Sequence, residues 1–174
     1  MKKFAMAVLS VLALAGFATV ALAQENSRGT ATLTLNGKTL SVEYGRPALK
    51  GRTTDQLLGN LPVGSFWRLG SNASTTFKTG ADLAFGDVAV PAGEYSLWMQ
   101  RKGDTSWNLV FNKQHGQFGT DHDASQDFAS VPLTNSTAAK PVETVTIKLA
   151  KAASGGTITI EWGTLEVAAN FKAK

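Results

Sequence analysis

The sequence contains no cysteine, and this absence removes several classes of protein. Disulfide bonds cannot stabilise the fold, thiol chemistry is excluded, and no lipid can be attached at a lipoprotein-type cysteine. The common catalytic motifs are missing as well: the chain has no Gly-x-Ser-x-Gly, Ser-x-x-Lys or His-Glu-x-x-His sequence and no phosphate-binding glycine loop. No motif therefore identifies a catalytic residue, and we expect no cofactor.

The N-terminus has the three parts of a secretory signal peptide, predicted over residues 1–23. Two lysines precede an apolar stretch over residues 4–14, which leads to the small-residue site Ala21-Leu22-Ala23. This order predicts cleavage after Ala23 and export to the periplasm or the medium. The alternative is an uncleaved anchor, because about twenty uncharged residues can span a bilayer. The Ala-x-Ala site favours cleavage, so we expect no membrane span in the processed protein.

Cleavage would leave residues 24–174, which we expect to form one domain. A chain of about 150 residues is long enough to bury a hydrophobic core without disulfides or metals. Removing Lys2 and Lys3 lowers the formal charge from +4 to +2. This small excess does not favour a nucleic-acid partner, and the sequence leaves the oligomeric state open.

Apolar and polar residues alternate along much of the chain, as in strands that have one buried and one solvated face. Residues 30–35 and 38–44 follow this pattern, and Asn36-Gly37 between them suits a type I′ turn, which predicts a β-hairpin. Further strands are predicted at residues 67–70, 75–79, 83–85, 88–90, 94–101, 106–112, 143–149 and 157–167.

One short helix is predicted over residues 53–58, because Thr53 and Gln56 have the spacing of a capping box. Residues 132–140 are rich in alanine, threonine and serine and are expected to form a surface loop. Together these patterns predict an all-β fold, an antiparallel β-sandwich that is jelly-roll-like, with this one helix.

Two side chains do not fit the alternation. Trp98 falls on the polar face of strand 94–101, where it either offers a ligand a stacking surface or is covered by a loop or the second sheet. Arg68 lies in the apolar run Phe66-Trp67-Arg68-Leu69. A partly buried arginine needs a carboxylate or carbonyl partner.

The densest cationic segment contains Arg46, Lys50 and Arg52. Together with Arg68 it would suit a carboxylate, phosphate or sulfated sugar, because guanidinium groups offer paired donors to such oxygens. The alternative is structural, with Arg46 or Arg68 paired to an acidic residue that holds a loop onto the sandwich. The carboxylates considered for this role are Asp55, Asp127 and Glu143.

A second polar cluster spans residues 112–127 and includes both histidines. Its candidate ligand-contacting residues are Asn112, Lys113, His115, Gln117, Asp123 and Asp127. Zinc is disfavoured by the seven-residue spacing of His115 and His122. Calcium is disfavoured because Gln126 and Pro132 stand where an EF-hand loop needs glycine and glutamate. We expect no metal here, and a hydrolase that uses this loop is an alternative function.

Four segments resemble, in order, the motifs of a secreted bacterial family, the domain of unknown function 2911. They are residues 44–52, 67–72, 91–97 and 107–113, which read YGRPALKGR, WRLGSN, PAGEYSL and WNLVFNK. The resemblance extends from about residue 30 to residue 171 and supports the fold and the export prediction, although the family brings no activity with it. The residues of the cationic segment and of residues 67–72 that match the family pattern are Arg46, Lys50, Arg52, Arg68 and Asn72.

The chain also departs from the pattern of that family at three positions. Ser71 stands in place of alanine, Phe118 in place of tryptophan, and Ser130 in place of arginine. The missing arginine weakens the case for Asp127 as part of a paired charge site.

We therefore expect an exported, non-catalytic binding module for a small anion or a glycan. The predicted ligand-binding residues are Arg46, Lys50, Arg52, Arg68, Asn72 and Trp98. Besides the hydrolase alternative, a structural or assembly role in the cell envelope is the third possibility.

Overall fold

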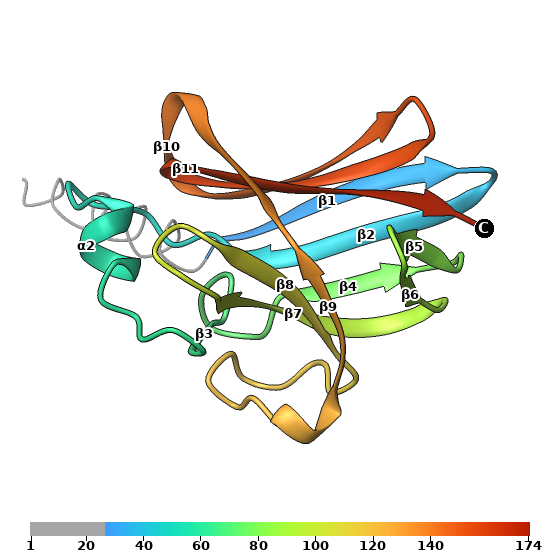
Figure 1. Ribbon diagram of the computed structural model, residues 1–174, viewed down its shortest axis with the longest axis horizontal. Helices are drawn as coiled ribbons and strands as arrows, with labels where there is room; N and C mark the ends of the chain where they lie inside the picture. The colour runs from blue at the N-terminus through green and yellow to red at the C-terminus, as the bar shows by residue number, and fades with distance from the viewer. Residues whose placement is uncertain (1–26) are drawn as a thin grey trace, which may run out of the picture.

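The computed structural model describes residues 27–174 (Figure 1). The predicted signal peptide, residues 1–23, lies outside this described part of the chain. None of the helices in residues 27–174 has the length and apolar character needed to cross a membrane.

Two antiparallel sheets pack face to face, which confirms the predicted all-β sandwich (Figure 1). The first sheet has the order β1-β2-β4-β7-β8-β9, and β3 also pairs with β7. Its strands are β1 (Arg28–Leu35), β2 (Lys38–Gly45), β3 (Phe66–Trp67), β4 (Thr76–Thr79), β7 (Gly93–Arg101), β8 (Trp107–Asn112) and β9 (Asp127–Pro132).

The second sheet has the order β10-β11-β5-β6 and lies over the first. Its strands are β5 (Leu83–Phe85), β6 (Val88–Val90), β10 (Thr134–Ala152) and β11 (Gly155–Ala173). The long β10–β11 pair runs across the top of Figure 1 above β1 and β2, whereas the connection from β8 to β9 lies at the bottom.

The β1–β2 hairpin forms as the sequence predicts. Leu35 pairs with Lys38, and the two residues between them, Asn36 and Gly37, have φ angles of 51° and 76°. Positive φ at both central positions defines a type I′ turn, whose twist matches that of the strands it joins. The alternation then places Leu40 and Val42 in the core with no exposed surface.

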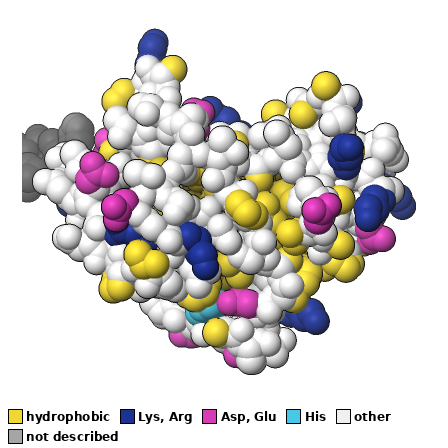
Figure 2. Space-filling model, in the orientation of Figure 1, with side chains coloured by type: hydrophobic (Ala, Val, Ile, Leu, Met, Phe, Trp, Pro, Cys, Tyr) yellow, Lys and Arg dark blue, Asp and Glu magenta, His cyan; other side chains and the backbone are white. Residues whose placement is uncertain are grey.

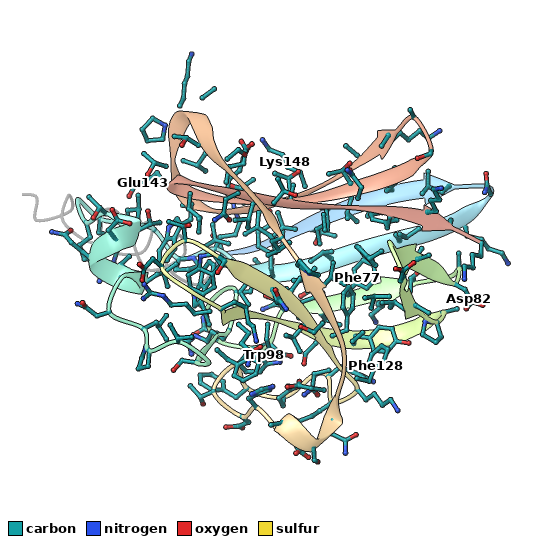
Figure 3. The ribbon with its side chains drawn as sticks, in the orientation of Figure 1. Phe77, Asp82, Trp98, Phe128, Glu143 and Lys148 are labelled. Carbon is teal, nitrogen blue, oxygen red and sulfur yellow. The ribbon has the colours of Figure 1, made fainter. Side chains whose placement is uncertain are left out.

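Side chains of both sheets form one hydrophobic core. Phe111 of β8 lies at its centre and makes ring contacts with Phe77, Phe85 and Tyr95 at centroid distances of 5.4 to 6.2 Å. Figure 3 shows Phe77 between the two sheets, whereas Trp98 lies on the other side of the first sheet, toward the β8–β9 connection. The first sheet is therefore covered on both faces near β7 and β8.

The short helix α2 (Thr54–Leu58) confirms the capping-box prediction. The Gln56 N–H donates to the Thr53 hydroxyl oxygen at 3.2 Å, and the Thr53 N–H donates to Gln56 Oε1 at 2.8 Å. Leu58 is buried on the side that faces the sandwich.

The structure corrects three sequence predictions. Residues 132–140 do not form a loop, because residues 134–137 pair with 165–168 of β11 in a regular ladder. Strand β9 was missed, and the strand predicted at 67–70 is shorter because Leu69, with a φ of 53°, turns the chain out of the sheet. Residues 134–137 are all exposed and polar, which hides their strand pairing from a reading by alternation.

Candidate ligand-binding pocket

A cavity of about 600 Å³ opens where α2, β3, the end of β7 and the β8–β9 connection meet. We call it the Arg68 pocket, after the arginine in its wall. Its apolar wall comes from α2 and the segment that follows, through Leu57, Leu58 and Leu61. The polar side chains considered below are on the remaining wall.

Three tryptophans from separate strands line the Arg68 pocket. The rings of Trp67 and Trp162 are stacked, with centroids 5.4 Å apart and planes 8° from parallel. Trp98 is only 3% exposed, and its indole N–H donates to the Ser96 hydroxyl at 2.9 Å. His122 of the β8–β9 connection packs on the ring at a centroid distance of 4.5 Å, so a loop covers Trp98, and the side chain also lines the cavity. A stacking surface for a ligand stays a prediction.

Arg68 is held by a rigid turn that leaves β3. Leu69 and Asn72 have φ angles of 53° and 61°, a conformation that costs free energy in residues other than glycine. The Leu69 carbonyl accepts a 2.7 Å hydrogen bond from the Thr75 hydroxyl, and the Asn72 carbonyl accepts one of 2.7 Å from the Gly119 N–H. These contacts fix the backbone that carries Arg68.

Glycine at position 45 is needed for this turn to pack against β2. A Cβ atom at Gly45 would lie 2.2 Å from the Ser71 carbonyl oxygen, a distance that no packed pair of atoms can adopt. The turn therefore lies directly on the end of β2, and Ser71 is brought to the wall of the Arg68 pocket.

The Arg68 guanidinium group makes no hydrogen bond or ion pair with any residue in the described range 27–174. The side chain is half-buried, and its Cδ lies against Gly119, where a Cβ would be 3.0 Å away. Neither Asp127 nor Glu143 neutralises it: Asp127 accepts from His122, and Glu143 accepts from the Lys50 backbone N–H. The structural pairing considered for Arg68 is therefore not formed within this range.

Two further polar groups in the same wall are buried without a hydrogen-bond partner among the described residues. They are the Ser71 hydroxyl and the Trp162 indole N–H. Buried polar groups are nearly always hydrogen-bonded in folded proteins, and an exception calls for an explanation such as a missing ligand. Neither residue was predicted from the sequence, because a serine in a turn and a tryptophan in a strand are ordinary there.

His122 and Asp127 form a hydrogen-bonded pair beside the pocket. His122 Nε2 lies 2.9 Å from Asp127 Oδ1, and the two side chains are 13% and 21% exposed. The imidazole ring lies between Phe66 and Trp98, at centroid distances of 4.2 and 4.5 Å. Asn112, which is fully buried, donates from Nδ2 to the same Asp127 oxygen at 2.7 Å. The orientation of the imidazole is thus fixed from three sides.

The cationic side chains of residues 46–52 do not line the Arg68 pocket, although Pro47 of the same segment does. Arg46 donates to the Thr144 hydroxyl at 2.9 Å and to the Val145 carbonyl at 3.5 Å, and Arg52 donates to the Leu49 carbonyl at 3.0 Å. The backbone N–H of Lys50 bonds Glu143, and Figure 3 shows Glu143 near α2, well separated from Trp98. Of the six predicted residues, only Arg68 and Trp98 line the pocket; Arg46, Lys50, Arg52 and Asn72 do not.

The second polar cluster mainly holds the β8–β9 connection onto the first sheet. Gln117 donates to the Ser96 hydroxyl at 3.3 Å, the Lys113 ammonium lies 5.7 Å above the Phe128 ring, and His115 Nδ1 is 3.4 Å from Glu94. The Ser125 hydroxyl and N–H donate to Asp123 at 2.6 and 3.0 Å, and these bonds lower the pKa of the Asp123 carboxyl.

Within residues 27–174, no three histidine or acidic side chains are grouped in a way that could hold a metal ion. The second polar cluster reaches the Arg68 pocket through a histidine that was not among its predicted ligand-contacting residues, His122.

Charged side chains are scattered over the face shown in Figure 2, with no extended patch of one sign. The apolar side chains gather near the middle of this face. This face therefore offers no positive track for a phosphate backbone.

Comparison with known proteins identifies a family and no activity. No curated protein matches the chain, and no solved structure matches it. The family model described as "Protein of unknown function (DUF2911)" matches residues 26–171, which includes every strand described above except the last two residues of β11. The chain therefore belongs to the DUF2911 family.

Proposed function

We propose that this protein binds a small organic anion, a carboxylate with an apolar body, in the Arg68 pocket. The observation that carries the proposal is the half-buried Arg68 guanidinium, which lines the cavity without a partner in the described chain. A guanidinium group presents several N–H donors in a plane and binds carboxylates through two parallel hydrogen bonds.

The other polar groups of the wall support an anion over a neutral sugar. The arginine and indole groups only donate, and the Ser71 hydroxyl donates as well. A ligand that satisfies all three must supply several acceptors close together, as a carboxylate does. A sugar presents donors and acceptors in equal measure and would need acceptors in the wall to match.

The remaining wall supports an apolar body on the ligand. Leucines of α2 and the three tryptophans surround a volume of about 600 Å³. Pockets of about 300 to 1,000 Å³ with mostly apolar walls and a few fixed polar groups are typical of small-molecule sites.

The test is a tryptophan-fluorescence titration of the purified protein with benzoate and butyrate. Three tryptophans line the pocket, so occupancy changes their emission. We expect both carboxylates to bind, and we expect Arg68→Gln to lower the affinity for each by about 10- to 100-fold. This is the effect of losing a hydrogen bond to a charged group, which is worth roughly 1.5 to 3 kcal/mol.

Two controls make the result specific. Benzamide and butyramide have the same apolar bodies without the charge, and they should bind weakly. Arg52→Gln removes an exposed arginine outside the pocket and should leave the titration unchanged. Equal binding of acids and amides, or unchanged affinity in Arg68→Gln, would show that the proposed function is wrong.

A further inference from the structure

The position of His122 adds a chemical group to the Arg68 pocket. Its Nε2 atom bonds Asp127 at 2.9 Å, while its other ring nitrogen, Nδ1, has no hydrogen-bond partner among residues 27–174. The side chain lines the cavity and is 13% exposed. A histidine that is oriented by a carboxylate and keeps one nitrogen available is the usual arrangement of a general base.

The support behind His122 is more extensive than a single hydrogen bond. Asp127 is itself held by Asn112, whose side chain is fully buried and also donates to the Asp123 carbonyl at 2.8 Å. Phe66 and Trp98 pack on the imidazole ring. The acceptor Asp127 fixes the proton on Nε2, so the lone pair is on Nδ1.

From this arrangement we propose that the Arg68 pocket hydrolyses a carboxylic ester, with His122 as the general base and Asp127 as its positioning residue. The inference rests on the proposed function, because the carboxylate bound there is the product of such a reaction. Donors that hold a carboxylate also stabilise the oxyanion that forms on an ester carbonyl.

The reaction needs only water as a co-reactant. Nδ1 of His122 takes a proton from a water molecule while the water oxygen forms a bond to the ester carbonyl carbon, and the carbonyl π electrons move to oxygen. When the tetrahedral intermediate collapses, the bond to the alcohol oxygen breaks and that oxygen takes the proton from His122. Carboxylic acid and alcohol leave, and the acid loses its proton to solvent.

The other polar groups that line the pocket have a role in this reaction. Arg68, the Ser71 hydroxyl and the Trp162 N–H are the donors available to the oxyanion. The Ser71 hydroxyl has no hydrogen-bond partner among residues 27–174, so no base activates it there; water is the nucleophile in this proposal, and Ser71 is an added donor.

The test is the release of 4-nitrophenol from 4-nitrophenyl acetate and butyrate by the full purified chain. We expect turnover above the spontaneous rate, a slower rate in D₂O, and a fall in kcat of about 100-fold or more in His122→Gln. The isotope effect should disappear from any residual activity of that variant, because proton transfer to the base is lost.

The surface histidine provides the matched control. His115 lies on the same connection, is paired with Glu94 and is 42% exposed. His115→Gln should therefore keep full activity. Asp127→Asn keeps an oxygen that can accept from Asn112, and it should lower kcat more than it raises KM. This variant tests the His122–Asp127 pair even if His122→Gln folds poorly.

The outcomes separate this inference from the proposed function. Butyrate that binds through Arg68, together with absent ester turnover or turnover unchanged in both His122→Gln and Asp127→Asn, would overturn the inference and leave the binding function standing. Loss of turnover in His115→Gln equal to that in His122→Gln would also overturn it. Absence of both butyrate binding and turnover would reject both proposals.

Discussion

Ser71 and Trp162 each bury a polar hydrogen that meets no acceptor within residues 27–174. A buried group without a hydrogen bond costs roughly 1 to 3 kcal/mol, so both side chains lower the stability of the unliganded protein. Apolar side chains at both positions would give the unliganded protein a higher free energy of unfolding. The proposed ligand would supply the acceptors that these two groups lack in the wall of the Arg68 pocket.

Replacing Ser71 by alanine tests this trade between stability and binding. Because the variant removes an unsatisfied hydroxyl and keeps Cβ, we expect Ser71→Ala to raise the free energy of unfolding by about 1 kcal/mol. Chemical denaturation with urea measures the change, and the fluorescence titration with butyrate should show weaker binding by the same protein. Lower stability in Ser71→Ala would mean that the hydroxyl already has a partner.

At the residue scale, the sequence identified two of the pocket side chains because each violates a pattern. Arg68 interrupts an apolar run, and Trp98 lies on the polar face of its strand. The cationic segment drew attention by charge density alone, and its arginines instead bond Thr144, Val145 and Leu49. A segment with many charges is usually exposed to solvent. A single charged residue within an apolar run is instead expected to be partly buried, and a buried charge needs a hydrogen-bond or ion-pair partner.

Helix α2 connects local stability to the pocket. Its capping box joins Thr53 and Gln56, and its Leu57 and Leu58 side chains form part of the apolar wall. A helix of one and a half turns has few hydrogen bonds of its own, so the cap contributes a large share of its stability.

We expect Thr53→Ala to lower the free energy of unfolding by about 1 kcal/mol, because the Gln56 N–H loses its acceptor. Binding of benzoate should weaken along with it, since the leucine wall becomes less ordered. Urea denaturation and the fluorescence titration measure the two effects. Thr53→Ser keeps the hydroxyl and serves as control; if it were destabilised as much as alanine, the cap would not be the cause.

The elements that the sequence predicted best are those with local signals. The β1–β2 hairpin and α2 have a turn dipeptide and a capping box within a few residues. The long strand β10 has no such signal, because its first half is polar and exposed and it is extended only by pairing with β11. The partners of residues 134–137 lie about 30 residues away, so this half of the strand is defined by tertiary structure.

At the scale of the whole molecule, the sandwich was predictable and the pocket was not. The alternation of apolar and polar residues within each strand shows which face of that strand is buried, and this is enough to predict two packed sheets. The Arg68 pocket is assembled from α2, β3, β7, β11 and the β8–β9 connection, which are distant in the chain. No pattern within one segment can report that Trp67 and Trp162 are stacked 5.4 Å apart.

The fold is also compatible with removal of the predicted signal peptide. Strand β1 begins at Arg28, so cleavage after Ala23 leaves every described strand intact. Among the described residues, both sheets contribute to one core. A chain that begins at Gln24 should therefore have the same urea midpoint as the protein recovered after export.

We propose that the full chain is exported and cut after Ala23, and expression in a bacterium with a periplasm tests this. Signal peptidase requires small residues at the positions before the cut, so the periplasmic fraction should contain a protein whose N-terminus is Gln24, measurable by intact mass.

Ala23→Glu places a large charged side chain at the cut and should leave an uncut precursor with the membranes. Ala31→Ser, a small change within β1, should be processed normally. Recovery of the uncut wild-type chain from the cytoplasm would contradict export, whereas an uncut wild-type chain in the membrane fraction would instead identify residues 1–23 as an anchor.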